Sequence, residues 1–388
     1  MLRGAQNARR FPTAVTSARS PMKNVLATTI VGALAVTSPA ALPAQRSDDG
    51  PTARPAQRLQ IGDPAPALQV EAFLKGEAIP ELARGTVYVI EFWATWCAPC
   101  VRQMPHLSAM QREFQGRGVR IVGVDCREMR RVGPAWERHF DVDEVRRFVA
   151  RQGDRIGYTI AFDGEDAACD DAWMRASNSG GLPTAFVVDR DGRVAWIGHP
   201  AMLRLPLRAV VDGSWDLTNG PAEVAAIERS FLDAIGQFGE DGNAGLRAWR
   251  AAARDHPRVA RDLVGAKFDA LVRAGRCADA WRAAEQVVLQ AAAHRDAVEL
   301  SRVAWTIVDP DATHASRDLG LALTAARIAN VITEGGDADV QRTLARAWFA
   351  IGDVEQAIAH QREALRVATP QGTARLSKTL EQYERTRR

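Results

Sequence analysis

The chain has 388 residues, enough for two or three domains, and its 46% hydrophobic and 25% charged residues are typical of a soluble globular protein. The net charge of +3 comes from the first 44 residues, which hold five basic residues and no acidic one, so the remainder carries −2. A nearly neutral protein gives no electrostatic basis for binding nucleic acid or an anionic membrane surface. Five cysteines are too few for a disulfide scaffold.

Residues 1–44 have the pattern of an export signal. A basic start is followed by an uncharged run, 24–44, with an apolar centre and small residues near its end. This pattern predicts a secretory signal peptide, with Met22 as an alternative start, and an extracytoplasmic protein, periplasmic or secreted. An uncleaved membrane anchor is the alternative, because the uncharged run is long enough to span a bilayer. The polar residues 45–58 are expected to form a linker.

Two cysteines follow an apolar, β-rich run at 87–90. The pattern predicts a buried strand, then a tight turn that opens a helix with Cys97 at its N-terminus. Unpaired N–H groups and the helix dipole would lower the pKa of the Cys97 thiol and make it the nucleophile. Cys100 lies about one helical turn further on, close enough to form a disulfide. A structural disulfide and half of a zinc site are the alternatives, but the chain has no second C-x-x-C or C-x-x-H, so we expect no metal.

The stretch Phe92–Cys100, with the sequence FWATWCAPC, resembles the active site of the thioredoxin superfamily. More narrowly, it is similar to the TlpA/ResA-like extracytoplasmic thiol–disulfide oxidoreductases, as is the segment Ile61–Pro66. The resemblance implies an α/β thioredoxin-like domain over residues 59–214, with a central mixed sheet flanked by helices and a helix–strand insertion. It implies no cofactor beyond the cysteine pair.

The elements expected after Cys100 follow from hydrophobic periodicity and turn residues. The first helix should run to about Gln115 and contain Pro105. The further elements are a strand at 119–124, a helix at 142–151, a strand at 158–162, a helix at 167–176, a hairpin over 185–198 with an Asp-Gly turn, and a closing helix at 203–211.

The resemblance also assigns roles in substrate docking. Pro183 is expected to be cis and to face the cysteine pair, a role that the family implies and the residue type alone does not. Leu182 and Thr184 would offer backbone groups to an incoming peptide, which would bind as a short strand. Trp96, beside Cys97, would form an apolar rim.

Glu91 occupies the position of the buried acid in thioredoxins, six residues before the first cysteine. A carboxyl group in apolar surroundings has a raised pKa, which suits it to accept the proton of Cys100 near neutral pH. The alternative is a solvent-facing strand residue.

Three further cysteines, Cys126, Cys169 and Cys277, are isolated in the sequence. Each is interpreted as a small buried hydrophobic residue. Cys126 ends a strand parallel to the one before Cys97, so a secondary thiol is an alternative for it.

Residues 215–222 are expected to be a linker, and residues 223–388 an α-helical domain. Helical spacing is visible at once in Val224, Ile227, Phe231, Ala234 and Phe238. Leu344–Pro370 fits a tetratricopeptide (TPR) helix–turn–helix, with Gly352-Asp353 as its turn, and Gly275 with Ala280 indicates a degenerate repeat. Trp305–Asn330 is expected to be helical. An ordinary helical bundle is the alternative.

These features predict a thiol–disulfide oxidoreductase that reduces disulfides of exported proteins and is itself reduced by a membrane thiol carrier. Its helical domain would bind a protein partner. The alternatives are a disulfide oxidase or isomerase, and a TPR-type scaffold with a secondary redox site. A redoxin-type peroxidase would need a threonine where Ala94 stands.

Overall fold

The computed structural model describes residues 58–368 and 373–387. The predicted signal peptide and nearly all of the predicted linker that follows it lie outside these residues. The strands are β1 (Ala72–Lys75), β2 (Val87–Trp93), β3 (Val119–Asp125), β4 (Met129–Val132), β5 (Ala135–Arg138), β6 (Thr159–Phe162), β7 (Thr184–Val188) and β8 (Val194–Gly198). The helices among them are α1 (Ala98–Phe114), α2 (Val142–Gln152), the π-helix η3 (Asp170–Arg175) and α3 (Arg204–Asp212).

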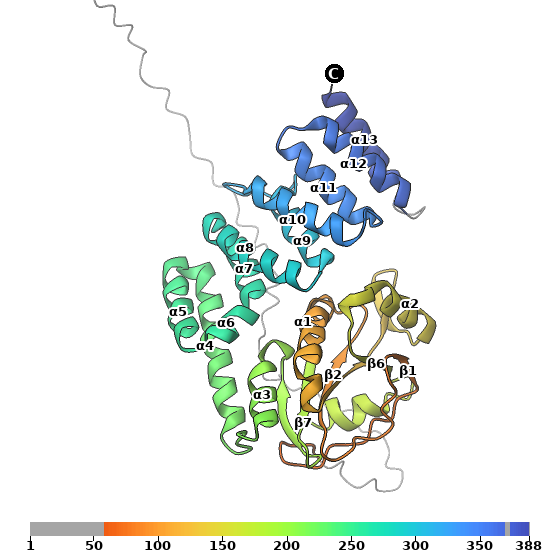
Figure 1. Ribbon diagram of the computed structural model, residues 1–388, viewed down its shortest axis with the longest axis vertical. Coiled ribbons are helices and arrows are strands. Elements are labelled where there is room, and N and C mark those ends of the chain that lie inside the picture. The colour runs from red at the N-terminus through yellow and green to blue at the C-terminus, as the bar shows by residue number, and fades with distance from the viewer. Residues whose placement is uncertain (1–57, 369–372, 388) are drawn as a thin grey trace, which may run out of the picture. The chain divides into compact units, whose positions relative to one another are not determined.

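Six strands form one mixed sheet in the order β1-β6-β3-β2-β7-β8 (Figure 1). β2 is parallel to β3, and β3 is parallel to β6, whereas β1, β7 and β8 pair antiparallel with their neighbours. All seven residues of β2 are buried, as expected for an apolar strand covered on both faces. β2 is a central strand, so the segment that follows it begins near the middle of the sheet, at the carboxyl end of β2.

Alternation along the strands divides their side chains between two apolar layers. Val89 and Trp93 pack on the face covered by α1, α2 and α3. Phe92 packs on the opposite face, where Trp173 of η3 contacts it at a ring-centroid distance of 6.4 Å. The architecture is the α/β thioredoxin-like fold, with α2 and β6 as the expected helix–strand insertion.

Most expected elements are present near their predicted bounds. α1 contains Pro105 and is followed by a 3-10 turn, Gln115–Arg117, that ends at Gly118. The β7–β8 hairpin turns at Gly192, which has a φ of +76°. The helix expected at 167–176 is present at residues 168–175, and most of it is the π-helix η3 rather than an α-helix. The hairpin of β4 and β5 was not predicted; β5 is fully exposed and β4 nearly so.

The described residues beyond Gly213 form only helices and their connections. These are α4 (Gly220–Glu240), α5 (Gly242–Asp255), α6 (Pro257–Asp262), α7 (Val264–Arg273), α8 (Cys277–Ala293), α9 (Ala297–Val308), α10 (Leu319–Ile332), α11 (Ala338–Ala350), α12 (Val354–Val367) and α13 (Thr373–Thr386). α11 and α12 form the predicted helical hairpin, with Gly352 in its turn at a φ of +92° and with Ala345 and Ala357 fully buried. The segment Trp305–Asn330 is helical where it overlaps α9 and α10, and residues 309–318 form the connection between them.

Candidate active site

Cys97 and Cys100 lie at the junction between β2 and α1. Cys97 is the N-cap residue of α1, and Cys100 lies in its first turn. The two form a disulfide with a Cα–Cα distance of 5.3 Å, and the Cys100 amide donates a hydrogen bond of 3.3 Å to the Cys97 sulfur. Because the first N–H groups of a helix lack intrahelical partners, this position stabilises a thiolate at Cys97 after reduction.

The residues before Cys97 are fastened to the segment that follows β3. Trp96 is 42% exposed, and its indole Nε1 donates a hydrogen bond of 3.0 Å to the carbonyl of Arg127. The amide and the hydroxyl of Thr95 both donate to the carboxylate of Glu128, at 2.5 and 2.7 Å. The turn that carries Cys97 is therefore held at two points, and Trp96 keeps an exposed apolar face.

Glu91 projects from β2 into the interior of the protein. It is 1% exposed and lies in register with Gly123 of β3 and Ala185 of β7. Its burial raises the pKa of this carboxyl from 4.5 to about 8, because a low-dielectric environment disfavours the charged form. Within the described residues its Oε1 atom has no hydrogen-bond partner. The alternative of a solvent-facing residue is wrong.

A second buried carboxyl, Asp125, was not identified from the sequence. It ends β3 in register with Trp93 and is 0% exposed, and neither of its oxygens has a hydrogen-bond partner in the described part of the chain. Burial, with the neighbouring Glu128 carboxylate as the next cause, raises the pKa of Asp125 well above its usual range. The interior near the cysteine pair therefore holds two carboxyl groups that favour their protonated forms.

The Leu182–Pro183 peptide bond is cis, as the resemblance implied. Because Thr184 lies in register with Phe92 on the antiparallel neighbour of β2, Pro183 reaches the same sheet edge as the cysteine pair. The Thr184 hydroxyl donates a hydrogen bond of 2.7 Å to the carbonyl of Gly181. Leu182 is partly buried. The fold thus brings together the segments that carry the predicted docking residues.

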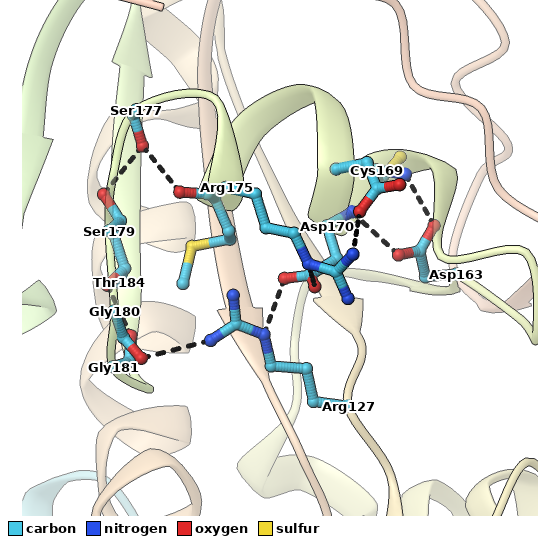
Figure 2. A network of polar contacts seen from close by, with 12 residues as sticks. Arg127, Asp163, Cys169, Asp170, Arg175, Ser177, Ser179, Gly180, Gly181 and Thr184 are labelled. Carbon is cyan, nitrogen blue, oxygen red and sulfur yellow. Dashed lines mark hydrogen bonds and ion pairs between the residues drawn. The ribbon is translucent and has the colours of Figure 1, made fainter. Parts of the chain in front are cut away.

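A polar network supports the segment before Pro183 (Figure 2). The Asp163 carboxylate accepts hydrogen bonds from the amides of Cys169 and Asp170, at 2.8 and 2.9 Å, where η3 begins. Arg127 donates from Nε to the Asp170 carboxylate at 2.7 Å and from Nη1 to the Gly180 carbonyl at 3.2 Å. These residues are scattered in the sequence, so no local pattern could have identified them.

The other three cysteines are buried, free thiols. Burial raises the pKa of Cys126 well above its usual value and that of Cys169 to about 12. A thiol with a raised pKa is a poor nucleophile near neutral pH, because the thiolate is the reactive form. The interpretation of Cys126 and Cys169 as inert hydrophobic residues is therefore the better supported one.

One group of potential metal ligands lies near the surface. His139 Nε2 is 3.1 Å from Glu144 Oε2, and Asp141 offers a third ligand atom nearby. Asp141 is the N-cap residue of α2 and accepts hydrogen bonds from the amides of Asp143 and Glu144. Helix capping therefore accounts for the position of this carboxylate.

Comparison with known proteins agrees with this geometry. A model of the AhpC/TSA family matches residues 61–197. Protein FixW of Rhizobium leguminosarum is 32% identical over 161 residues, which are 41% of this chain and 70% of FixW. Thiol-disulfide oxidoreductase ResA of Bacillus anthracis is 30% identical over 140 residues, which are 36% of this chain and 69% of ResA.

The crystal structure of a thiol:disulfide interchange protein of the thioredoxin family from Chlorobium tepidum is 23% identical, with a TM-score of 0.29, covering 39% of this chain and 97% of that one. Among the described helices, none combines the length and the apolar character needed to cross a membrane. With FixW and ResA matched over more than two thirds of their lengths, the chain belongs to the ResA-like thiol–disulfide oxidoreductases of the thioredoxin superfamily and is a protein-disulfide oxidoreductase.

Proposed function

We propose that the protein reduces disulfides in exported protein partners through the Cys97/Cys100 pair. The observation that carries this proposal is the disulfide at the start of α1, with Cys97 as the N-cap residue. Helix N-terminal stabilisation favours the thiolate of Cys97 over that of Cys100, because Cys97 is the N-cap residue whereas Cys100 lies inside the first turn. The two cysteines therefore have different roles.

The reaction begins from the reduced enzyme. The Cys97 thiolate attacks one sulfur of the partner disulfide, which breaks that S–S bond and forms a mixed disulfide; the departing partner sulfur takes up a proton. Cys100 then loses its proton and attacks the Cys97 sulfur, which releases the second partner sulfur as a thiolate. Two electrons pass from the enzyme to the partner, and the Cys97–Cys100 disulfide remains.

Glu91 is proposed to accept the proton that Cys100 must lose in the second step. Its pKa of about 8 keeps most of it protonated near neutral pH while leaving an ionised fraction that can act as a base. A carboxyl with an ordinary pKa would be almost wholly ionised but a much weaker base. Burial thus matches the proton affinity of Glu91 more closely to that of a thiol.

Docking of the partner is proposed to use two walls beside the disulfide. One wall is Trp96, and the other is the segment Leu182–Thr184. The exposed face of Trp96 would contact apolar side chains of the partner. Leu182 and Thr184 would offer backbone groups on either side of Pro183, so that the partner segment adds as a short strand. The Thr184 hydroxyl already donates to Gly181, which leaves the backbone as the available part of this residue.

The cellular setting of the proposal rests on the sequence pattern. Residues 1–44 would direct export, and the oxidised enzyme would be reduced again by a membrane thiol carrier outside the cytoplasm. The helical region beyond Gly213 would bind a protein partner. The α11–α12 hairpin, with fully buried Ala345 and Ala357 where the helices meet, supports a TPR-like unit there.

A trapping experiment tests the proposal. In Cys100→Ser the mixed disulfide cannot be resolved, so this variant should accumulate a covalent adduct with insulin chains. Dithiothreitol should cleave this adduct by reducing its disulfide bond. Cys97→Ser should form no adduct and reduce no insulin. If both variants retain insulin only non-covalently, and equally with and without dithiothreitol, the scaffold alternative replaces the oxidoreductase mechanism.

A further inference from the structure

Arg127 has a backbone conformation that its residue type disfavours. Its φ is +56°, in the left-handed region that favours glycine, and it comes two residues after the end of β3. A long side chain in this region is under conformational strain. Such strain persists where surrounding contacts over-determine the conformation. The contacts of Arg127 therefore hold it in this conformation.

Arg127 contacts both walls of the proposed docking site. Its backbone carbonyl accepts the hydrogen bond of the Trp96 indole at 3.0 Å. Its guanidinium donates to the Gly180 carbonyl at 3.2 Å, three residues before Pro183. Figure 2 shows the guanidinium between Asp170 and the Gly180–Gly181 segment. One residue thus joins the exposed indole beside Cys97 to the loop that carries the cis proline.

The Asp170 carboxylate fixes the position of that guanidinium. Its side chain is 0% exposed and lies 2.7 Å from Arg127 Nε and 3.2 Å from Arg175 Nε. Arg175 is 53% exposed, whereas the Arg127 side chain is only 25% exposed and is the more enclosed partner. A buried carboxylate requires such a partner. Asp170 therefore orients the Arg127 fork, and the fork holds Gly180.

We propose that Arg127 is a positioning residue that sets the separation between Trp96 and the Gly180–Pro183 loop, and so tunes docking of the partner polypeptide. This inference rests on the proposed function, because it assumes that the two walls bind the substrate chain. The hydrogen bonds and the ion pair of Arg127 within the described residues join it to Trp96, Asp170 and Gly180, and to neither sulfur of the disulfide. Its loss should therefore affect binding of a polypeptide rather than the chemistry of the thiols.

The local conformation allows a clean substitution. Arg127→Gly removes the guanidinium and relieves the left-handed strain, and Arg175 remains 3.2 Å from the Asp170 carboxylate, so the variant should fold. Arg127→Lys keeps the charge but lacks the planar fork that reaches two acceptors. Arg295→Gly is the matched control, because Arg295 is also left-handed, with a φ of +54°, and has an exposed side chain far along the sequence.

Hydrogen exchange tests the contact between Arg127 and Gly180 without assuming any activity. The amides of residues 176–179, just before Gly180, donate hydrogen bonds to carbonyls of η3 between Asp171 and Arg175. In the full-length Arg127→Gly protein they should exchange about tenfold faster, the effect of losing one hydrogen bond to a charged group. Arg295→Gly should leave them unchanged. Equal exchange rates in Arg127→Gly and the control would contradict the proposal that Arg127 holds the Gly180 segment.

Kinetics test its consequence for docking. With dithiothreitol as electron donor, Arg127→Gly should raise the KM for insulin about tenfold, with kcat within about twofold. The rate constant of the prereduced protein, freed of dithiothreitol, with the small disulfide dithiobis(nitrobenzoate) should also stay within about twofold. Arg127→Lys should lie between this variant and the wild type. An unchanged KM for insulin, or an equal loss in kcat/KM for insulin and in the rate constant for the small disulfide, would overturn the inference. A wild type that reduces neither disulfide would instead refute the proposed function, whatever the exchange data show.

Discussion

The carboxylate of Glu128 accepts two hydrogen bonds from Thr95, one from the amide at 2.5 Å and one from the hydroxyl at 2.7 Å. The two residues are 33 positions apart in the sequence, and Glu128 is 6% exposed. This contact fixes the turn between β2 and Cys97 to the segment after β3. It also places a carboxylate beside Asp125, where it raises the pKa of that buried acid.

Removal of this carboxylate should destabilise the protein. Glu128→Ala leaves the Thr95 amide without its charged acceptor, so the free energy of unfolding should fall by about 2 to 4 kcal/mol. Urea denaturation of the oxidised protein measures this. Glu137→Ala is the control, because Glu137 lies in the exposed strand β5 and should change stability by less than about 0.5 kcal/mol. Equal losses in the two variants would contradict the assigned contact.

The buried Glu91 makes the stability of the oxidised protein depend on pH. Its pKa is about 8 in the folded protein, against an ordinary value of 4.5, so between these values the unfolded chain releases a proton that the folded protein retains. Relative to Glu91→Gln, the wild type should be most stable below pH 4.5. It should lose about 1.4 kcal/mol per pH unit up to about pH 8 and then level off. Urea denaturation at each pH gives the free energy of unfolding of both proteins. A difference between the two free energies that does not change over this pH range would disprove the burial argument.

Glu91→Gln should also slow the resolving step. The amide cannot accept the Cys100 proton, so release of the partner from the mixed disulfide should be slower by about 10²-fold or more. The initial attack by Cys97 should be almost unchanged. Stopped-flow mixing of the reduced protein with a disulfide-containing peptide separates the attack phase from the resolving phase. An unchanged resolving rate would remove Glu91 from the proton path.

The α11–α12 turn provides a test in the helical region. Gly352 has a φ of +92° and no neighbour near the position of an added Cβ, so Gly352→Ala should lose about 1 to 2 kcal/mol through backbone strain alone. Gly265→Ala is the matched control in α7, where the added Cβ also meets open space but φ is ordinary. The control should be neutral or stabilising by up to about 1 kcal/mol. Thermal unfolding of both variants measures these changes in stability. A Gly352→Ala protein as stable as the wild type would contradict the left-handed turn.

The sequence was sufficient to predict the centre of the fold. The apolar run before Glu91, the helix start at Cys97 and the Asp-Gly turn are local patterns, and each is found in the structure. The resemblance supplied the cis isomer of Pro183, which the residue type alone does not determine. The signal peptide lies outside the described residues and stays a prediction.

The features that were missed depend on contacts between distant segments. Arg127, Glu128 and Asp170 carry no local motif, and only the parallel arrangement of β2 and β3 brings the first two to the Cys97 turn. The β4–β5 hairpin escaped prediction because its mostly exposed strands lack the apolar alternation of a half-buried pair. η3 is a π-helix whose first amides are held by Asp163, and no periodicity in ten residues distinguishes it from an α-helix.

The direction of the reaction is the central claim, and the equilibrium potential of the Cys97/Cys100 pair tests it most directly. The full-length protein would be equilibrated in glutathione buffers, and the oxidised fraction of the peptide carrying both cysteines measured by alkylation and mass spectrometry. A potential near or below about −230 mV is predicted for a reductase. A potential near about −120 mV would make the protein an oxidant of exported chains and contradict the proposed electron flow.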